Sequence, residues 1–356
     1  MQTFFAPGRT ELAGNHTDHQ KGRILAAAVD VGITAKVTPV EQPLVTIASE
    51  GFAPFTVDLR DLEPLEAEKE TSAALVRGVA AGIRARGGEI CGFEAAVSST
   101  IRSGGGLSSS AAFEILMGRI WNGLCSGNRF DALTLAMIGQ EAENRFFGKP
   151  SGLMDQIACA TNGAVYVDFA TMEVRPIPAD FRALGYVLSL TDTGGSHANL
   201  TAAYAAVPED MRRIARALGG ELLSDIPEAT FDARRQEGPD WDRAKHYYDE
   251  NRRVPAMAEA LERGDMETYL QLMNESGRSS EQLLRNIRAA EGDDCLERGL
   301  ALAASLLEGR GAWRVHGGGF AGCVQALTPV AEFDTYRAAM DAEFGKGACE
   351  AIDICG

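Results

Sequence analysis

A chain of 356 residues with 45% hydrophobic and 24% charged side chains is long enough for two domains and has the composition of a globular protein. Its 34 basic and 50 acidic side chains leave a net charge of −16, which repels polyanions and argues against a nucleic-acid partner. No apolar run approaches the roughly 20 residues of a transmembrane helix, and the first residues lack the pattern of a signal peptide. We therefore expect a cytoplasmic protein with no membrane partner.

The seven cysteines are scattered along the chain and form no C-x-x-C pair. Their odd number in a long chain argues against a disulfide framework. We expect them to be small core residues rather than metal ligands or nucleophiles.

The first half of the chain alternates short strands with longer helices. β-Branched stretches separated by Gly or Pro predict strands at 31–37, 44–48, 55–59 and 93–100. Helical spacing at 71–86 ends at Gly87-Gly88, a C-cap signal. A glycine- and serine-rich run at 103–112 precedes a helix that continues through 124, and a second helix covers 131–146. The loop at 148–152 leads into a further helix at 153–160.

The second half is richer in helix. Strands are predicted at 164–169 and 186–190, and 198–307 is mostly helical. Strands at 313–315 and 322–327 flank a glycine cluster, a helix covers 333–344 and a strand 349–354. The elements do not follow βαβ regularity, so we expect an α+β fold. The change from strand-rich to helix-rich sequence predicts two domains, 1–182 and 183–356.

The run at 103–112 is suited to binding phosphate. Its glycines let the backbone approach a ligand closely, and its serines stand where a helix would begin, so N–H groups and the positive helix end would face an anion. Serine hydroxyls can also complete a Mg²⁺ shell. A flexible linker or a capped turn would give the same pattern. It is not a Walker loop, and Gly148-Lys149-Pro150 lacks the upstream glycine that such a loop requires.

A polar cluster lies near the N-terminus, in Ala6-Pro7-Gly8-Arg9 and Gly14-Asn15-His16-Thr17-Asp18-His19. It places an arginine, an amide, two imidazoles and a carboxylate beside a predicted Pro-Gly turn. Carboxylate and amide oxygens accept hydrogen bonds from sugar hydroxyls, so the cluster suits a polyhydroxylated ligand. A solvated turn or a metal site are the alternatives, although three ligands crowded in one loop lack the usual spacing of a zinc site.

Two further segments carry candidate residues. Gly152-Leu153-Met154-Asp155-Gln156 places an acid in an otherwise apolar stretch, where it must be paired or protonated unless it is only a helix N-terminal charge. His316-Gly317-Gly318-Gly319-Phe320-Ala321-Gly322-Cys323 is a glycine cluster between strands, which would also suit a simple hairpin.

In this order the four segments resemble the galactokinases of the GHMP kinase superfamily. The resemblance implies a two-domain α+β fold, with an N-terminal domain like ribosomal protein S5 domain 2 and a C-terminal ferredoxin-like domain. It implies an enzyme that uses ATP and Mg²⁺ to phosphorylate the anomeric hydroxyl of a hexose, with a sugar and ATP as its small-molecule partners. It also leads us to expect a monomer or a weak dimer.

The resemblance also implies roles for individual residues. Asp155 would be the catalytic acid–base residue and Arg9 its partner. Glu143 would help Ser110 to hold Mg²⁺, unless it is a surface helix charge. The implied ATP-binding residues are Gly104, Gly105, Gly106, Leu107, Ser108, Ser109, Ser110 and Ala111. The implied sugar-site residues are Asn15, His16, Asp18, Gly152 and Tyr204, the last of which would otherwise be a core aromatic, with Gly317, Gly318 and Gly319 closing the site.

Two departures from the family pattern leave the substrate open. Asn15 stands where galactokinases usually have Glu, and His19 where they have Tyr. A Glu would repel a carboxylate at sugar C6 by on the order of 4 kcal/mol at ~4 Å. Asn15 removes that repulsion, while His19, Lys21 and Arg23 are expected to raise the local positive charge. The run Asp18-His19-Gln20 also resembles galacturonokinases, yet Asn can hydrogen-bond a hydroxyl, so galactose and galacturonate are both candidates.

Two other functions are open at this point. A non-catalytic galactose and ATP sensor would share the motifs, but the presence of Arg9, Asp155 and the serine run argues against it. A GHMP kinase acting on mevalonate or homoserine is disfavoured by the segment His16-Thr17-Asp18.

Overall fold

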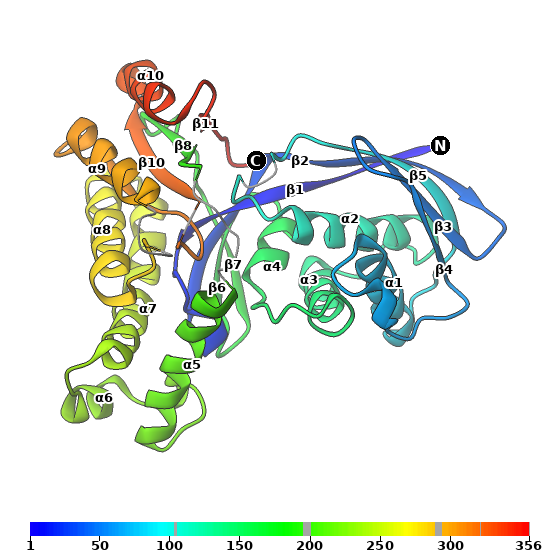
Figure 1. Cartoon of the computed structure of the whole chain (residues 1–356), viewed down its shortest axis with the longest axis horizontal. Helices are drawn as coiled ribbons and strands as arrows, with labels where there is room; N and C mark the ends of the chain where they lie inside the picture. The colour runs from blue at the N-terminus through cyan, green and yellow to red at the C-terminus, as the bar shows by residue number, and fades with distance from the viewer. Residues whose placement is uncertain (103–104, 195–200, 289–293, 321, 356) are drawn as a thin grey trace.

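Two β-sheets with helices packed on them make up the chain, seen in the computed structural model of Figure 1. The structure describes all residues except 103–104, 195–200, 289–293, 321 and 356. The first sheet has seven strands in the order β4-β3-β5-β2-β6-β7, with β1 paired to β2 outside this path. Its strands are β1 (Gln2–Ala13), β2 (Arg23–Val40), β3 (Leu44–Ser49), β4 (Phe55–Asp58), β5 (Gly92–Ser99), β6 (Ala164–Asp168) and β7 (Glu173–Ile177).

The long strand β2 organises this sheet. Its first half pairs with β6, from Arg23 opposite Asp168, and its second half pairs with β5, from Ile33 opposite Ser99. β1 runs antiparallel along β2, with irregularities in register between Pro7 and Arg9 and between Glu11 and Ala13. Only β3 and β5 pair in parallel among the described strands of this sheet.

Four helices cover one face of the first sheet, below it in Figure 1. They are α1 (Ser72–Ala85), α2 (Ser109–Leu124), α3 (Ala132–Ala142) and α4 (Met154–Ala160), with a π-turn, η3 (Glu143–Phe147), after α3. Trp121 anchors α2, because its fully buried ring meets the edge of Phe93 on β5 at 5.5 Å and its N–H donates to the carbonyl of Cys91 at 3.0 Å. The far end of α2 carries Ser109 and Ser110, so this packing fixes where the serines lie.

The second sheet is antiparallel, in the order β11-β8-β10-β9. It comprises β8 (Tyr186–Asp192), β9 (Ala312–Val315), β10 (Cys323–Pro329) and β11 (Cys349–Ala351). The helices of this half are α5 (Thr201–Leu218), α6 (Glu228–Arg234), α7 (Pro239–Arg263), α8 (Met266–Ser279), α9 (Cys295–Leu307) and α10 (Phe333–Phe344), with a second π-turn, η5 (Ser280–Leu284), after α8. Short 3₁₀ turns complete the described elements: η1 (Asp18–Gln20), η2 (Glu66–Glu68), η4 (Leu223–Asp225) and η6 (Val330–Glu332).

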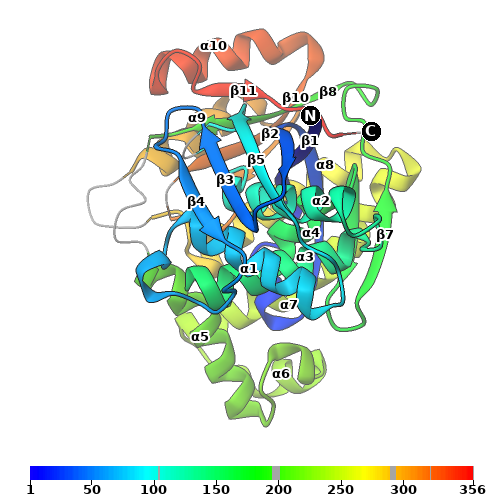
Figure 2. The same cartoon turned by 90° about the vertical axis from the view of Figure 1, so that its right-hand side faces the viewer.

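The two halves share one apolar core. The largest cluster of buried side chains includes Ile24 and Trp121 from the first half together with Leu188, Val254 and Met273 from the second. Figure 2 shows the second sheet lying above α1, α2, α3 and α4, with α10 above the sheet. The division of the chain into domains at 182 and 183 stays a prediction.

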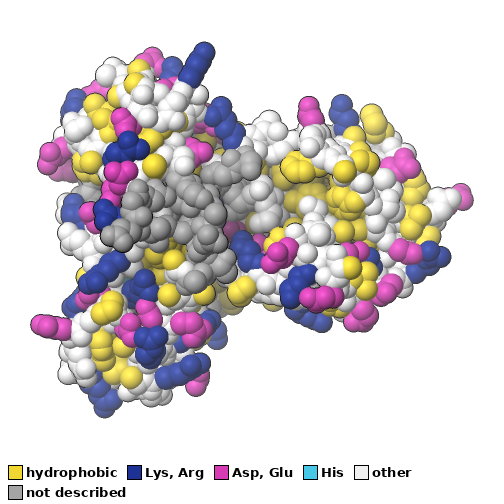
Figure 3. Space-filling model, viewed as in Figure 1, with side chains coloured by type: hydrophobic (Ala, Val, Ile, Leu, Met, Phe, Trp, Pro, Cys, Tyr) yellow, Lys and Arg dark blue, Asp and Glu magenta, His cyan; other side chains and the backbone are white. Residues whose placement is uncertain are grey.

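The surface carries both signs of charge. On the face shown in Figure 3, Lys and Arg side chains alternate with Asp and Glu over both halves of the molecule. Within the described residues, no helix is long and apolar enough to cross a membrane.

The α+β architecture is confirmed, and most predicted elements occur within a few residues of their expected bounds. β1 and β7 were not predicted. The expected Pro-Gly turn was wrong, because Pro7 and Gly8 lie inside β1 at its register irregularity. The predicted helix at 131–146 is divided into α3 and η3.

Candidate active site

Arg9 and Asp155 form an ion pair between β1 and the first turn of α4. The Arg9 Nε donates to Asp155 Oδ1 at 2.8 Å, and its Nη1 donates to the carbonyl of Gly106. The Arg9 side chain is 8% exposed and that of Asp155 is 32% exposed. The guanidinium therefore joins the carboxylate to the glycine- and serine-rich loop.

Ser108 completes the surroundings of Asp155. It precedes α2 in the left-handed region, at φ 53° and ψ 63°, and its hydroxyl donates to Asp155 Oδ2 at 2.6 Å. Burial alone would raise the pKa of Asp155, but the charge of Arg9 and the hydrogen bonds from Arg9 and Ser108 lower it below its ordinary value. Asp155 is thus held as a carboxylate. Sequence reasoning placed Ser108 with ATP and missed this contact, for which the sequence carries no signal.

A close approach at Gly8 brings the N-terminal strand against this loop. A Cβ at Gly8 would lie 2.9 Å from the carbonyl oxygen of Leu107, and the Arg9 N–H donates to that same oxygen at 3.1 Å. Glycine is therefore required at position 8 by the contact between strand and loop, not by a turn.

The rest of the predicted phosphate loop lies at the start of α2. Ser109 and Ser110 are its first two residues, where backbone N–H groups have no partner within the helix. Gly105 and Ser110 are half-buried, Gly106 and Ser109 are exposed, and Leu107 and Ala111 pack inward. Gly104 lies outside the described residues. The arrangement suits an anion at the helix N-terminus.

Glu143 connects this helix start to the interior. Its Oε1 accepts from the Ser110 hydroxyl at 3.3 Å and from Lys149 Nζ at 3.1 Å, and its Oε2 accepts from Gln156 Nε2 at 2.9 Å. The residue as a whole is 2% exposed, so the surface position considered for Glu143 is wrong.

Glu143 is hydrogen-bonded to Gln156, which is in turn hydrogen-bonded to Glu114. Gln156 is fully buried, and the second hydrogen of its Nε2 goes to Glu114 Oε2 at 3.0 Å, so the amide links two carboxyl groups. Burial, followed by the charge of Glu143, raises the pKa of Glu114 to about 9, so Glu114 is neutral at pH 7. Glu114 was not predicted, although it follows Ser110 by one helical turn.

Asp18 lies beside Asp155 on the loop between β1 and β2. Its Oδ1 accepts from its neighbour's backbone, the His19 N–H, at 2.9 Å. Burial, followed by the charge of Asp155, raises the pKa of Asp18 to about 6. A Cβ at Gly152 would lie 1.7 Å from Asp18 Oδ2, so only glycine fits opposite this carboxylate.

His16 and His19 are both neutral. Because a carbonyl only accepts, His16 Nε2 donates to Gly318 O at 3.0 Å, and its Nδ1 then accepts from His19 Nε2 at 3.3 Å. Burial lowers the pKa of both rings, which agrees with this assignment. Arg23 is paired with Asp168 at 2.8 Å. Of the three residues expected to raise the positive charge around this loop, His19 is uncharged and Arg23 is neutralised by its partner, whereas Lys21 is exposed and keeps its charge.

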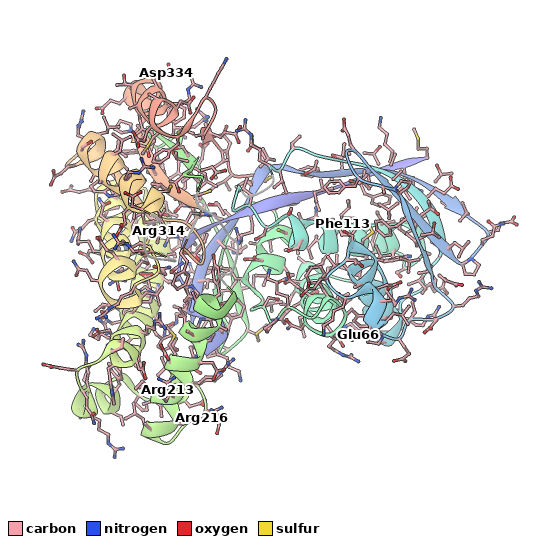
Figure 4. The ribbon with its side chains drawn as sticks, in the orientation of Figure 1. Glu66, Phe113, Arg213, Arg216, Arg314 and Asp334 are labelled. Atoms are coloured by element: carbon pink, nitrogen blue, oxygen red, sulfur yellow. The ribbon has the colours of Figure 1, made fainter. Side chains whose placement is uncertain are left out.

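The Asn15 side chain is 1% exposed and bound to protein groups. Its Nδ2 donates to both oxygens of Glu11 at 3.3 Å and to the carbonyl of Gly317, and its Oδ1 accepts from Asn286 at 3.0 Å. Glu11 in turn accepts from Arg314 at 2.8 Å, and Arg314 lies where the C-terminal helices meet β1 (Figure 4). Asn15 thus forms part of a buried network that supports the loop.

The glycine cluster after β9 closes over the same loop. The carbonyls of Gly317, Gly318 and Gly319 accept from Asn15, His16 and Tyr204 respectively, the last from the tyrosine hydroxyl at 2.6 Å. The structure therefore brings together predicted residues that are about three hundred positions apart in the sequence. Tyr204 is half-buried on α5 and packs edge-on against Phe320 at 5.3 Å.

Comparisons with known proteins find matches along the whole chain. Residues 74–163 match the GHMP kinases N terminal domain, and residues 2–39 match the galactokinase galactose-binding signature. The chain is 30% identical to the galactokinase of Glaesserella parasuis serovar 5, over all of this chain and 93% of that protein. It is also 30% identical to the galactokinase of Streptomyces coelicolor, over 97% of this chain and 89% of that protein.

Solved structures give the same result. The crystal structure of Lactococcus lactis galactokinase complexed with galactose is 25% identical, with a TM-score of 0.87 over all of this chain and 94% of the other. The mevalonate kinase of Methanococcus jannaschii, at 14% identity and a TM-score of 0.72, shares the fold.

Proposed function

The chain belongs to the galactokinase family of the GHMP kinases, and from this we propose that it transfers the γ-phosphoryl group of ATP to the anomeric hydroxyl of galactose. The observation that supports this most is the position of Asp155. Its carboxylate lies between the start of α2, which suits phosphate, and Asp18, which suits a sugar. An ionised carboxylate at that point can accept the proton of the hydroxyl as it attacks the phosphorus.

The reaction follows from these contacts. Asp155 accepts the proton of the anomeric hydroxyl as the sugar oxygen bonds to the γ-phosphorus, and the bond between that phosphorus and the β,γ-bridging oxygen breaks to release ADP. General-base assistance of this kind contributes roughly 10²–10⁴-fold. Arg9 keeps Asp155 ionised before reaction and places a fixed positive charge beside the group in transfer.

The phosphate side also suits Mg²⁺. Magnesium binds through one or two carboxylates and the substrate's phosphates while keeping several waters. Glu143 Oε1 and the Ser110 hydroxyl meet at 3.3 Å and are the side-chain oxygens that would hold it, and the metal would neutralise charge on the phosphates. No group of three or more His, Cys, Asp or Glu suited to a metal occurs within the described part of the chain.

The sugar side supports a neutral hexose. Asp18 accepts from ring hydroxyls, and His16 with the loop at 317–319 completes the binding surface. Galacturonate is the weaker candidate, because His19 is neutral and Arg23 is already paired with Asp168, which leaves only Lys21 of the three basic residues near this loop to face a carboxylate. A cytoplasmic enzyme that is a monomer or a weak dimer, with nucleotide and sugar between the two halves, completes the proposal.

The test is ADP release from ATP and Mg²⁺ in the presence of different acceptors. The panel contains galactose, galacturonate, N-acetylgalactosamine, glucose, arabinose and mevalonate. We expect strong turnover with galactose. Turnover with galacturonate alone would contradict the choice of substrate, and binding of galactose and ATP without ADP release would indicate a sensor.

A further inference from the structure

The segment Gly148-Lys149-Pro150 has a fixed place beside the proposed phosphate site. The backbone N–H groups of Gly148 and Lys149 both donate to the carbonyl of Glu143, at 3.0 and 3.1 Å. Pro150 restricts the residue before it to extended conformations. The position of the Lys149 side chain is therefore set by the same residue that faces the start of α2.

The Lys149 ammonium meets Glu143 at the oxygen that faces Ser110. Its Nζ lies 3.1 Å from Glu143 Oε1, the atom that also accepts from the Ser110 hydroxyl at 3.3 Å. Because Gln156 holds the other carboxylate oxygen at 2.9 Å, Glu143 cannot turn both oxygens away from this point. The Glu143 side chain is 3% exposed and that of Lys149 is 59% exposed, so the lysine reaches inward from the surface.

Asp155 also influences the charge of the Lys149 ammonium. Burial opposes the charge of Lys149, but the charges of Glu143 and Asp155 together raise its pKa above the ordinary value. The influence is mutual, since Lys149 is among the groups that lower the pKa of Asp155. The charge of Lys149 therefore acts on Asp155 as well as on Glu143, which it contacts directly.

We propose that Lys149 is a further catalytic residue, whose ammonium binds the γ-phosphoryl group of ATP between Glu143 and Asp155. This rests on the proposed function, since it assigns a contact to the same transferred group. Lys149 contacts Glu143, which accepts from Ser110. Asp155 accepts from Ser108, so both carboxylates face the start of α2, where the phosphate would bind. Lysine is a compact charge on a flexible stem, so its ammonium could turn from Glu143 to the phosphate if Glu143 held Mg²⁺.

The alternative is that Lys149 only neutralises Glu143. The two roles differ in their dependence on the γ-phosphate, because a partner of Glu143 alone would affect ADP and ATP equally. Lys149→Met removes the charge and keeps the length of the side chain. Lys69→Met is the matched control, since Lys69 packs on Gly148 but pairs with the exposed Glu66 at 3.6 Å (Glu66 is labelled in Figure 4).

The experiment is calorimetric titration of each protein with Mg-ADP and with the non-hydrolysable β,γ-imido analogue of Mg-ATP. For Lys149→Met we expect an affinity loss of at least about tenfold for the analogue, as one charge-assisted hydrogen bond is lost, and about twofold or less for ADP. For Lys69→Met we expect both affinities within about twofold of the wild type.

Equal losses for both nucleotides, or no loss for either, would overturn the role of Lys149. Lys149→Gln, compared by thermal melting, provides the same test if the methionine variant does not fold. Failure of the proposed function gives a different result, namely wild-type protein that neither binds the analogue nor releases ADP with galactose.

Discussion

The two carboxylates of the site, Asp155 and Asp18, lie close together in opposite environments. Asp155 has a guanidinium at 2.8 Å and a hydroxyl at 2.6 Å, which lower its pKa. Asp18 has no ion-pair partner among the described residues, and burial with the charge of Asp155 raises its pKa to about 6. When the surroundings of two neighbouring carboxyl groups move their pKa values in opposite directions, the two groups are suited to different roles. In the proposed function, Asp155 is therefore an ionised carboxylate that is ready to accept a proton, whereas Asp18 serves to recognise the sugar.

The largest effect is expected for Asp155→Asn. The amide keeps the shape of the side chain but cannot accept the proton, so turnover should fall roughly 10²–10⁴-fold. Single-turnover ADP release measures this fall, and titration with the imido analogue checks that nucleotide binding is retained. Turnover near the wild-type rate in a variant with an unchanged melting temperature would remove Asp155 from the mechanism.

Gly152→Ala should displace the Asp18 carboxylate and leave Asp155 in place. The new Cβ would lie 1.7 Å from Asp18 Oδ2, so Asp18 must move. We expect KM for galactose to rise about tenfold or more, the cost of a lost charge-assisted hydrogen bond, while the affinity for ADP stays unchanged. An unaltered KM would show that Asp18 does not bind the sugar.

Asp18→Asn should weaken sugar binding and stabilise the fold at neutral pH. The folded pKa of about 6 exceeds the unfolded value near 3.8, so the folded protein binds more protons and loses stability as the pH rises from about 4 to 6. Above pH 6 the variant should be more stable by roughly 1–3 kcal/mol. Urea unfolding at pH 5 and pH 8 measures the difference, which should be larger at pH 8. A smaller gain at pH 8 than at pH 5 would contradict the raised pKa.

The smallest effect is expected for Tyr204→Phe, because Tyr204 contacts the loop at 317–319 and is not one of the two carboxylates, Asp155 and Asp18. The change removes the hydrogen bond to the Gly319 carbonyl, worth roughly 0.5–1.5 kcal/mol. We expect a rise of a few fold in KM for galactose with little change in kcat. A large fall in kcat would mean that Tyr204 acts on the reaction itself rather than on the loop at 317–319.

Local sequence signals predicted much of the fold. The start of α2 at Ser109 and the end of α1 before Gly87 follow from glycine and serine positions that the backbone requires. β1 was missed because its residues 6–9 contain Pro and Gly, which usually interrupt strands. The strand tolerates them at a register irregularity, where Gly8 also admits the Leu107 carbonyl.

The sequence indicated which residues belong to the proposed site better than it indicated their hydrogen-bond partners. The order of four motifs indicated Arg9 and Asp155, whose contact at 2.8 Å joins positions 146 residues apart. The link from Glu143 through Gln156 to Glu114 depends on the packing of three helical segments, which no local pattern specifies. The buried engagement of Asn15 likewise depends on groups from the far end of the chain.

The most direct test of the central claim is the position of the transferred phosphate. Wild-type protein and Asp155→Asn are incubated with ATP, Mg²⁺ and galactose, and the product is examined by phosphorus NMR with proton coupling. We predict a sugar phosphate whose phosphorus couples to the anomeric proton, formed by the wild type and almost absent with the variant. A phosphate coupled to the C6 protons, or equal product from both proteins, would contradict the assignment of Asp155 as the base at the anomeric hydroxyl.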